Sequence, residues 1–490
     1  MTVPDDAARD AHLQALGALV DVPLADELGA RFAEAGAELY LVGGTVRDIL
    51  RGVSEGVDLD FATSALPQQT AALLNGWADH VWLTGVRFGT VSAARGDALI
   101  EVTTYRSDAY SPGSRHPEVQ FGADIATDLS RRDFTVNAIA VRVPDRLVVD
   151  PFGGWEDLRL GVLRTPIEAK RSFGDDPLRM VRLARFTASL GFTPDAEAVA
   201  AATVMADELH HVSAERIQLE LDKLLTAEHF SAGMDLLVET GLADVFLPEV
   251  PALRMQHDPL HHHKDVYSHT LAVVENCARE DVVLRLAALL HDIGKPATRE
   301  FHDDGAVTFH HHDVVGARMT RHRMRELKYS REMIRDVSEL VRLHLRFHGY
   351  ADGDWTDGAV RRYVNDAGSP QQLVRLNRLT RADVTTRNKA RRRRFAEAMN
   401  HLEARIEALN EQQQLDEIRP AVDGTQMMAY LGIPPGPLVG KAWAWLKDKA
   451  IEHGPMTQDE GFALLDAWAA EQGLSVVGER VPPKPKKITD

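Results

Sequence analysis

The sequence predicts an α+β protein in which a small mixed-sheet head is followed by all-helical regions. Between residues 38 and 150, short β-like runs alternate with helical pieces, and after residue 158 the apolar residues recur mainly at helical spacing. The length of 490 residues suggests about three domains. Apolar residues make up 44% and charged residues 26% of the chain, which is typical of a globular protein with sizeable cores.

The predicted head contains strands bounded by turn residues. It is preceded by an acidic segment, residues 1–30, for which we expect a leading helix and a short arm. Alternation of apolar and polar residues favours strands in the head itself. The four β-like runs are ELYLVGG from residue 38, DLDFATS from 58, TVSAARGDALIEVTTY from 90 and AIAVRVPDRLVVD from 138.

Helices are predicted for the rest of the chain. One runs from Asp175 to a stop at Gly191, and another follows Ser213 as its N-terminal cap. Three prolines near 248–259 favour a linker, and the Pro/Lys tail VPPKPKKITD is expected to be disordered. We therefore divide the chain into a head at 1–155, a helical neck at 156–255, a His-rich region at 256–390 and a helical C-terminal region with a flexible tail at 391–490.

Composition excludes several classes of protein. The chain has 56 Lys and Arg against 73 Asp and Glu, and its net charge of −17 argues against a general nucleic-acid coat. The single Cys277 excludes an internal disulfide and fits a reducing compartment. The start, MTVPDDAARD, lacks the features of a signal peptide, and the sequence offers no apolar stretch of about 18 residues to span a membrane. A cytoplasmic protein is expected.

Two glycines stand between the first predicted strand and a helix. Gly43 and Gly44 let the backbone approach a bulky anion, and the N–H groups at the start of the helix can bind phosphate. Arg47 and Asp48 follow one turn into the helix. An ordinary turn is the alternative, and the lack of a GK[ST] motif excludes a P-loop.

Two carboxylates follow on the next strand. Asp58 and Asp60 lie at i and i+2, so both project from one face. Like charges so close repel unless a divalent cation lies between them. Glu101, on a neighbouring strand, is a candidate third carboxylate, with a solvated strand acid as the alternative. A phosphate-binding turn followed by this pair favours nucleotidyl transfer assisted by two Mg²⁺ ions.

These motifs resemble those of the class II tRNA nucleotidyltransferases and bacterial poly(A) polymerases, within the DNA polymerase β-like superfamily. The resemblance covers about residues 40–255 and implies that Asp58 and Asp60 are the catalytic metal ligands. RRDFTVNAIA is similar to a second family motif, DPFGGWEDLRLGVLRT to a third, DDPLRMVRLARF to a fourth and ERIQLELDKLL to a fifth. The second motif implies that the sugar and triphosphate face Arg131, Arg132, Asp133 and Asn137.

The fourth motif implies that Asp176 and Arg179 pair with the edge of the incoming base. Asp offers only acceptors and Arg a fork of donors, so the pair can complement a base without a template. Asp176, Arg179, Arg182 and Arg185 recur every three residues and are expected on one helix face, where a salt-bridge ladder is the alternative. The polar segment 105–122 is similar to the family's flexible loop, and the alternative is an ordinary surface loop.

Histidines are concentrated in the second half. Thirteen of the 21 lie between 257 and 348. The doublet His291-Asp292 ends a strongly apolar helix, where two adjacent polar groups need a partner that a metal can supply.

The order of His and Asp residues resembles the HD superfamily of metal-dependent phosphohydrolases. The resemblance implies four basic ligands, His269, His291, Asp292 and Asp383, and two further ligands of binuclear members, His312 and His344. Imidazole and carboxylate together suit one or two ions of Mn, Fe, Co, Ni or Zn. A metal-bound water would attack a phosphoester.

One segment of the chain is rich in basic residues, although the chain as a whole is acidic. Between Arg361 and Arg394 there are eleven Lys and Arg against two acids. Solvated helix faces are the alternative, but counterion release makes such a patch favourable for a polynucleotide. RNA contact is expected at 387–394, which includes Arg391, Arg392, Arg393 and Arg394.

Together these patterns predict addition of CCA to tRNA 3′ ends from CTP and ATP, with an HD domain that hydrolyses phosphoesters at RNA ends. One alternative is a poly(A) polymerase or an enzyme that adds only A or only CC. Another, from a different class, is an HD phosphohydrolase whose front half binds tRNA. Neither a membrane nor DNA is expected as a partner, and the oligomeric state is left open.

Overall fold

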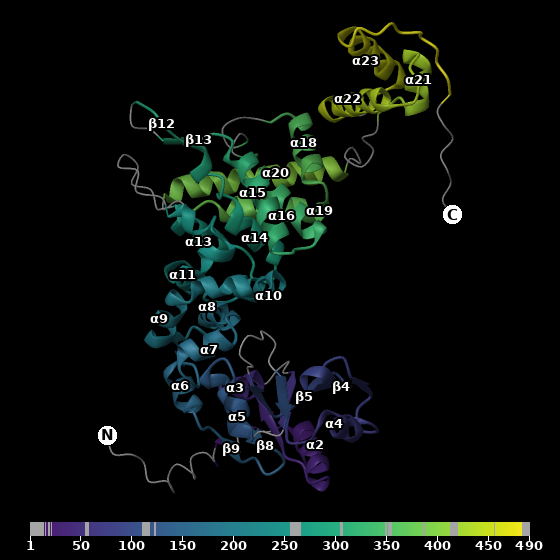
Figure 1. Ribbon diagram of the computed structural model, residues 1–490. Helices are drawn as coiled ribbons and strands as arrows, with labels where there is room; N and C mark the ends of the chain where they lie inside the picture. The colour runs from purple at the N-terminus through teal and green to yellow at the C-terminus, as the bar shows by residue number, and fades with distance from the viewer. Residues whose placement is uncertain are drawn as a thin grey trace. The chain divides into compact units, whose positions relative to one another are not determined.

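A seven-stranded mixed sheet forms the centre of the head, which confirms the predicted fold class (Figure 1). Its strand order is β3-β4-β5-β2-β1-β8-β9, in which β2 and β5 are parallel and the other neighbours are antiparallel. The strands are β1 (Leu39–Val42), β2 (Leu59–Thr63), β3 (His80–Trp82), β4 (Thr90–Arg95), β5 (Ala98–Thr104), β8 (Ala140–Arg142) and β9 (Val148–Val149).

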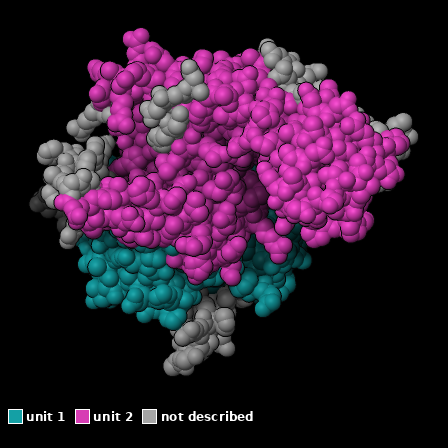
Figure 2. Space-filling model, turned by 90° about the horizontal axis from the view of Figure 1, so that it is seen from above, with its two compact units in different colours: residues 1–251 teal, residues 252–490 magenta. Residues whose placement is uncertain are grey.

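The chain divides into two compact units, Met1–Pro251 and Ala252–Asp490, coloured separately in Figure 2. The structure is a computed structural model. It describes residues 14, 16, 17, 20, 22–53, 58–109, 118–121, 124–254, 266–303, 307–347, 350, 355–385, 388–411, 420–454 and 456–482. Most of the predicted leading segment, the centre of the predicted flexible loop and most of the Pro/Lys tail lie outside these residues.

Both faces of the head sheet are covered by apolar packing. Phe61 of β2 belongs to the larger core, together with Phe32 and Leu41. Alternation along β2 turns Asp60 and Ala62 to the other face, where Ala62 packs with Leu129. The remaining head elements are the helices α2 (Pro23–Glu34), α3 (Gly44–Leu50), α4 (Pro67–Leu74) and α5 (Ile125–Ser130), the 3-10 helices η1 (Val86–Phe88) and η2 (Thr135–Asn137), and the hairpin β6 (Arg106–Ala109) with β7 (Glu118–Phe121).

The neck is helical, as predicted, and packs around α8. Helix α8 ends at Leu190 and is capped by Gly191, whose φ of 68° lies in the left-handed region. Ser213 caps α10 by accepting a hydrogen bond from the Arg216 N–H. The neck contains α6 (Gly154–Leu160), β10 (Val162–Leu163), α7 (Ala169–Asp175), α8 (Leu178–Leu190), β11 (Thr193–Pro194), α9 (Ala196–Val204), η3 (Ala206–His211), α10 (Ala214–Leu225), α11 (Phe230–Glu239), α12 (Leu242–Phe246) and η4 (Pro251–Leu253).

The expectation that Asp176 shares one helix face with Arg179 is wrong. Helix α7 ends at Asp175 and α8 begins at Leu178, so Asp176 lies in the break between them. Its backbone is extended, with φ −149° and ψ 99°. The ring of Pro177 disfavours a helical conformation in the residue before it, which explains the break.

The second unit begins as a helical bundle around α14, whose residues from Leu284 to Leu290 are buried. Gly294 lies so close to α15 that a Cβ there would be 2.2 Å from the carbonyl oxygen of His312. The unit contains α13 (Val266–Glu275), α14 (Val282–Leu290), η5 (Pro296–Thr298), β12 (Arg299–Phe301), β13 (Val307–Phe309), α15 (His312–Glu326), α16 (Arg331–Leu343), α18 (Asp357–Ala367), α19 (Pro370–Ala382), α20 (Lys389–Glu411), α21 (Gly424–Leu431), α22 (Pro437–His453) and α23 (Gln458–Glu471).

The last three helices have an apolar core of their own, which includes Met427, Leu446 and Phe462. Within the described residues, no helix combines the length and the apolar character needed to cross a membrane.

Candidate active sites

Three carboxylates meet where the interior strands β2 and β5 of the head sheet pair. The parallel register of β2 and β5 places Asp60 directly opposite Glu101, and Asp58 comes immediately before β2. The Thr45 hydroxyl donates a hydrogen bond of 2.6 Å to the carbonyl of Asp58, which ties α3 to the start of this strand. Burial, then the charge of Glu101, raises the pKa of Asp60 to about 6, with a further contribution from Asp58. Such mutual repulsion fits a site for a divalent cation.

The Gly43–Gly44 turn lies against this cluster. A Cβ on Gly43 would be 3.7 Å from Asp60 Oδ2 and 3.0 Å from Arg132 Nη1. A Cβ on Gly44 would be 3.4 Å from Arg47 Nη2. The structure therefore brings Arg132, from the second motif, next to the turn, Arg47 and Asp60, which belong to the first motif.

The residues of the second motif take different positions. Arg132 is half-buried and pairs with Asp128 at 3.3 Å. Asp133 is buried and accepts hydrogen bonds from Asn137 Nδ2 at 2.9 Å and Arg182 Nε at 2.9 Å. Burial alone would raise the pKa of Asp133, but the Arg182 charge and these hydrogen bonds lower it to about 2. Arg131 is half-buried, and its carbonyl accepts a hydrogen bond from Arg179.

The two residues predicted to select the base have separate partners. Asp176 Oδ2 accepts a hydrogen bond of 2.8 Å from Arg216, whereas Arg179 Nη1 is buried and donates to the Ser172 hydroxyl at 2.9 Å. Arg182 and Arg185 both pair with Glu220, at 3.0 and 2.9 Å. The salt-bridge alternative therefore describes these last two arginines. Sequence reasoning missed Glu220 and Arg216, although their spacing of four residues on one predicted helix was available.

In the second unit, the six predicted HD-site ligands form two triplets. The ligand atoms within each triplet lie within 4.8 Å of one another. Five segments supply them: α13, the end of α14, the start of α15, and the residues that follow α16 and α19. One triplet is His269, His291 and Asp383, and the other is Asp292, His312 and His344.

Asp292 faces both triplets. Its Oδ2 lies 3.2 Å from His291 Nε2, and its Oδ1 lies 3.4 Å from His312 Nε2. The Lys295 ammonium group also pairs with Oδ2, at 2.6 Å. This geometry allows the two oxygens of Asp292 to serve two adjacent cations.

Backbone carbonyls orient three of the imidazoles. The Nδ1 atoms of His291, His312 and His344 lie 2.7, 2.8 and 2.6 Å from the carbonyl oxygens of the residues three positions earlier. A carbonyl only accepts, so Nδ1 must carry the proton, and in the neutral ring Nε2 then presents a lone pair. Among the described residues, none of these three Nε2 atoms has a hydrogen-bond partner. Buried lone pairs left in this way suit metal coordination.

The protonation states also suit a metal. Burial, followed by the charge of His291, lowers the pKa of His344 to about 4, and burial lowers the pKa of His312. The pKa of Asp383 is lowered despite its burial, because His269 Nε2 lies 2.9 Å away and the charge of His291 is close. The charge of Asp292 raises the pKa of His291 despite its burial, whereas neutral His312 and His344 and ionised Asp383 are in the forms that bind a divalent cation.

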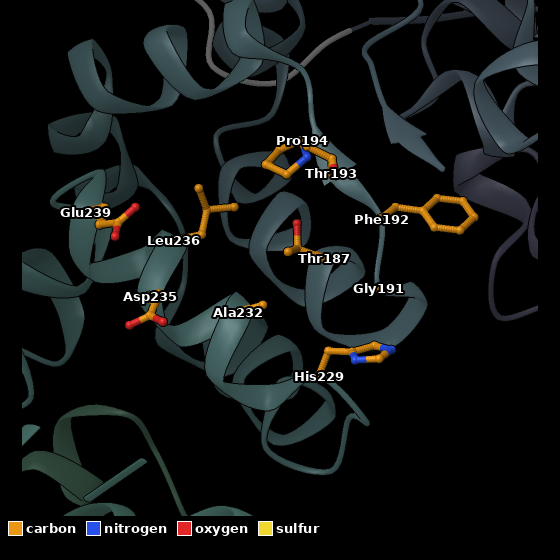
Figure 3. A pocket seen from close by; sticks show the side chains of 10 residues that line it. All are labelled: Thr187, Gly191, Phe192, Thr193, Pro194, His229, Ala232, Asp235, Leu236 and Glu239. Atoms are coloured by element: carbon orange, nitrogen blue, oxygen red, sulfur yellow. The ribbon is translucent and has the colours of Figure 1, made fainter. Parts of the chain in front are cut away.

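A pocket of about 370 Å³ in the neck is lined by none of the predicted site residues (Figure 3). Asp235 and Glu239 of α11 line one side, and Phe192 and Pro194 lie across from them. Its two carboxylates make it unsuited to a phosphodiester backbone. The predicted RNA patch lies elsewhere, on the exposed first turns of α20, where Arg391, Arg392, Arg393 and Arg394 follow one another.

Three family models match consecutive parts of the chain. Residues 39–164 match the poly A polymerase head domain, 191–253 the probable RNA and SrmB-binding site of polymerase A, and 266–406 the HD domain. The A-adding tRNA nucleotidyltransferase of Deinococcus radiodurans is 33% identical over 444 residues, which cover 88% of this chain and 95% of that enzyme. The chain belongs to the tRNA nucleotidyltransferase family. The resemblance predicted from the motifs is confirmed, and the protein is a nucleotidyltransferase of tRNA processing.

Other tRNA nucleotidyltransferases match over different lengths. The CCA-adding enzyme of Geobacillus stearothermophilus is 39% identical over 229 residues, which are 46% of this chain and 55% of that enzyme, so this match spans about half of the relative. The solved structure of Bacillus stearothermophilus CCA-adding enzyme in complex with CTP covers 93% of this chain and is itself covered to 99%, with a TM-score of 0.65 and 25% identity. Thermotoga maritima CCA-adding enzyme complexed with tRNA has a TM-score of 0.56 at 18% identity over 93% of this chain and 98% of that one, which shows a common fold.

Proposed function

We propose that this tRNA nucleotidyltransferase adds C, C and A to the 3′ end of tRNA from CTP and ATP and releases pyrophosphate. The observation that carries the proposal is the parallel pairing of Asp60 with Glu101 beside the Gly43–Gly44 turn. The similarity to the Bacillus stearothermophilus CCA-adding enzyme, whose structure was solved in complex with CTP, supports the choice of substrates.

In this proposal, Asp58 and Asp60 hold Mg²⁺ and Glu101 supplies further negative charge next to them. Mg²⁺, when bound, activates the attacking hydroxyl and stabilises charge on the triphosphate. The backbone of the Gly43–Gly44 turn lets the triphosphate approach. The guanidinium of Arg132 and the carboxylate of Asp60 both lie next to the Cβ position of Gly43. Asp176 and Arg179 select the base.

A second candidate is the addition of A alone. It is favoured by the match along 88% of the chain to an enzyme named A-adding, while the match to the Geobacillus stearothermophilus CCA-adding enzyme covers 46%.

A tRNA that ends before CCA and one that ends in CC distinguish the two functions, when each is incubated with CTP, ATP or both. CCA addition extends the first tRNA by three nucleotides only when both triphosphates are present. Refusal of CTP combined with A addition to the second tRNA establishes the alternative, and continuous A addition contradicts both.

Magnesium dependence is expected to change near pH 6. Asp60 must be ionised to bind Mg²⁺, and its pKa is raised to about 6. The Mg²⁺ concentration for half-maximal addition should therefore be constant above pH 6 and increase about tenfold for each pH unit below it. Glu101→Gln removes the charge that contributes most after burial, so it should move this change to lower pH. A half-maximal concentration that does not vary between pH 5 and 7 would contradict the assignment.

Alanine at Gly43 is expected to lower addition by about tenfold or more. Gly43 has a φ of 74°, and a Cβ would displace Arg132 from the turn beside Asp60. Gly52→Ala is the matched control, because Gly52 has a φ of 82° and open space around its Cβ position. Initial rates and melting temperatures of both variants separate the two effects. Equal losses of activity in both would mean that backbone strain alone is responsible.

We also propose that the HD unit hydrolyses phosphoesters at RNA ends with one or two divalent transition metals. The two triplets around Asp292 and the three unpaired, buried Nε2 atoms support this activity. Their mixed donors fit Mn, Fe, Co, Ni or Zn. We infer that the arginines at 391–394 bind the phosphate backbone of the RNA, since four exposed cations follow one another there.

A further inference from the structure

A continuous line of polar side chains connects the neck to the Gly43–Gly44 turn. Glu220 Oε1 accepts a hydrogen bond of 3.0 Å from Arg182 Nη1, and Arg182 Nε donates to Asp133 Oδ2 at 2.9 Å. Asn137 Nδ2 donates to Asp133 Oδ1 at 2.9 Å, and Asn137 Oδ1 accepts from Arg47 Nη1 at 2.7 Å. We call these five residues the Glu220–Arg47 network.

Four of the five members are shielded from solvent, and the fifth, Arg182, is half-buried with 29% of its side chain exposed. Glu220, Asp133, Asn137 and Arg47 are all buried, with exposed fractions between 4% and 9%. Both ends of the Asn137 amide are engaged, so its orientation is fixed by its two neighbours. Hydrogen bonds between charged groups are strong where water is excluded, and a network of this kind holds its members in one geometry.

Glu220 forms ion pairs with two of the three arginines that lie around the Phe186 ring. The guanidinium carbons of Arg185, Arg47 and Arg182 lie 3.4, 5.3 and 5.4 Å from the centroid of the Phe186 ring. Glu220 Oε2 accepts from Arg185 at 2.9 Å, while its Oε1 accepts from Arg182. Without this carboxylate, the two neighbouring, half-buried arginines would lose a counter-charge that they share.

The far end of the network lies at the candidate phosphate site. Arg47 also donates to both oxygens of Asp48, at 2.9 and 2.6 Å, so its guanidinium is held from two sides. Its Nη2 lies beside Gly44, at 3.4 Å from the position of a Cβ. A displacement of Arg47 would change the charge next to the backbone that the triphosphate approaches.

We propose that Glu220 is a positioning residue for the incoming nucleotide, acting through Arg182, Asp133 and Asn137 on the guanidinium of Arg47. The proposal rests on the proposed function, in which the Gly43–Gly44 turn takes the triphosphate. Asp133 and Arg182 then act on the nucleotide indirectly, by holding the guanidinium of Arg47 in position.

A double-mutant cycle tests the proposal. Glu220→Gln and Asn137→Ala are each expected to raise the KM for CTP and ATP about tenfold, with kcat changed less than about threefold, because both release Arg47. The KM of the double variant should be no higher than that of the single variant with the higher KM, because the first substitution already interrupts the network. Multiplied effects, about a hundredfold in KM, would show that the two residues act independently and would overturn the proposal.

Two further variants separate positioning from general stability. Leu237→Ala removes a fully buried side chain from α11. It serves as the control because it should lower the melting temperature about as much as the Glu220 variant does. An equal rise in KM in this control would assign Glu220 a purely structural role. Glu220→Asp keeps the charge with a shorter reach, and replaces Glu220→Gln in the cycle if that variant does not fold. Failure of the wild-type chain to add nucleotides would refute the proposed function itself, whereas normal wild-type addition with multiplied effects refutes only the network.

Discussion

Asp60→Asn is expected to lower nucleotide addition by about a thousandfold or more and to leave phosphoester hydrolysis unchanged. Asp60 lies opposite Glu101 and beside the Gly43–Gly44 turn, so the substitution removes the carboxylate at the centre of the head site. Metal stabilisation of the transferring phosphate contributes several kcal/mol, which corresponds to about three orders of magnitude in rate. The structure itself should tolerate the change, because the substitution relieves repulsion among the carboxylates.

The measurement compares both activities in one preparation of the full chain. Initial rates of nucleotide addition to tRNA and of phosphoester hydrolysis are determined with saturating divalent metal. Asp97→Asn, in the turn between β4 and β5, is the control for the same chemical change on the same sheet. Parallel loss of both activities, with the melting temperature retained, would contradict two separate sites.

Asp292→Ala is expected to have the opposite effect, abolishing phosphoester hydrolysis while nucleotide addition continues. Both oxygens of Asp292 face ligand triplets, so its removal affects both candidate metal positions. His344→Ala removes a ligand from one triplet only. Metal analysis of purified protein should therefore give up to about two ions per wild-type chain, about one for His344→Ala and close to none for Asp292→Ala.

The control for this prediction is His310→Ala. His310 is exposed and stands two residues before the ligand His312, but it belongs to neither triplet. Its substitution should leave metal content and hydrolysis unchanged. Retention of two metal ions in Asp292→Ala, or loss of an ion in His310→Ala, would show that the ligand assignment is incorrect.

Local signals in the sequence predicted much of this arrangement. Apolar alternation predicts the head strands, and Gly191 and Ser213 mark helix ends that the structure confirms. These features depend on neighbouring residues and are therefore visible in the sequence. The one clear error has a local cause as well: Pro177 separates Asp176 from α8, although the spacing of three residues favoured one continuous helix face.

By itself, the sequence determined the fold class, the order of the motifs and the residue types available for chemistry. Only the tertiary structure decided which of these residues meet. The parallel register of β2 with β5 selects Glu101 as the neighbour of Asp60, and the close approach of α8 and α10 joins Arg182 to Glu220. Such contacts join residues far apart in the chain, and strand register and helix packing, not local propensity, specify them.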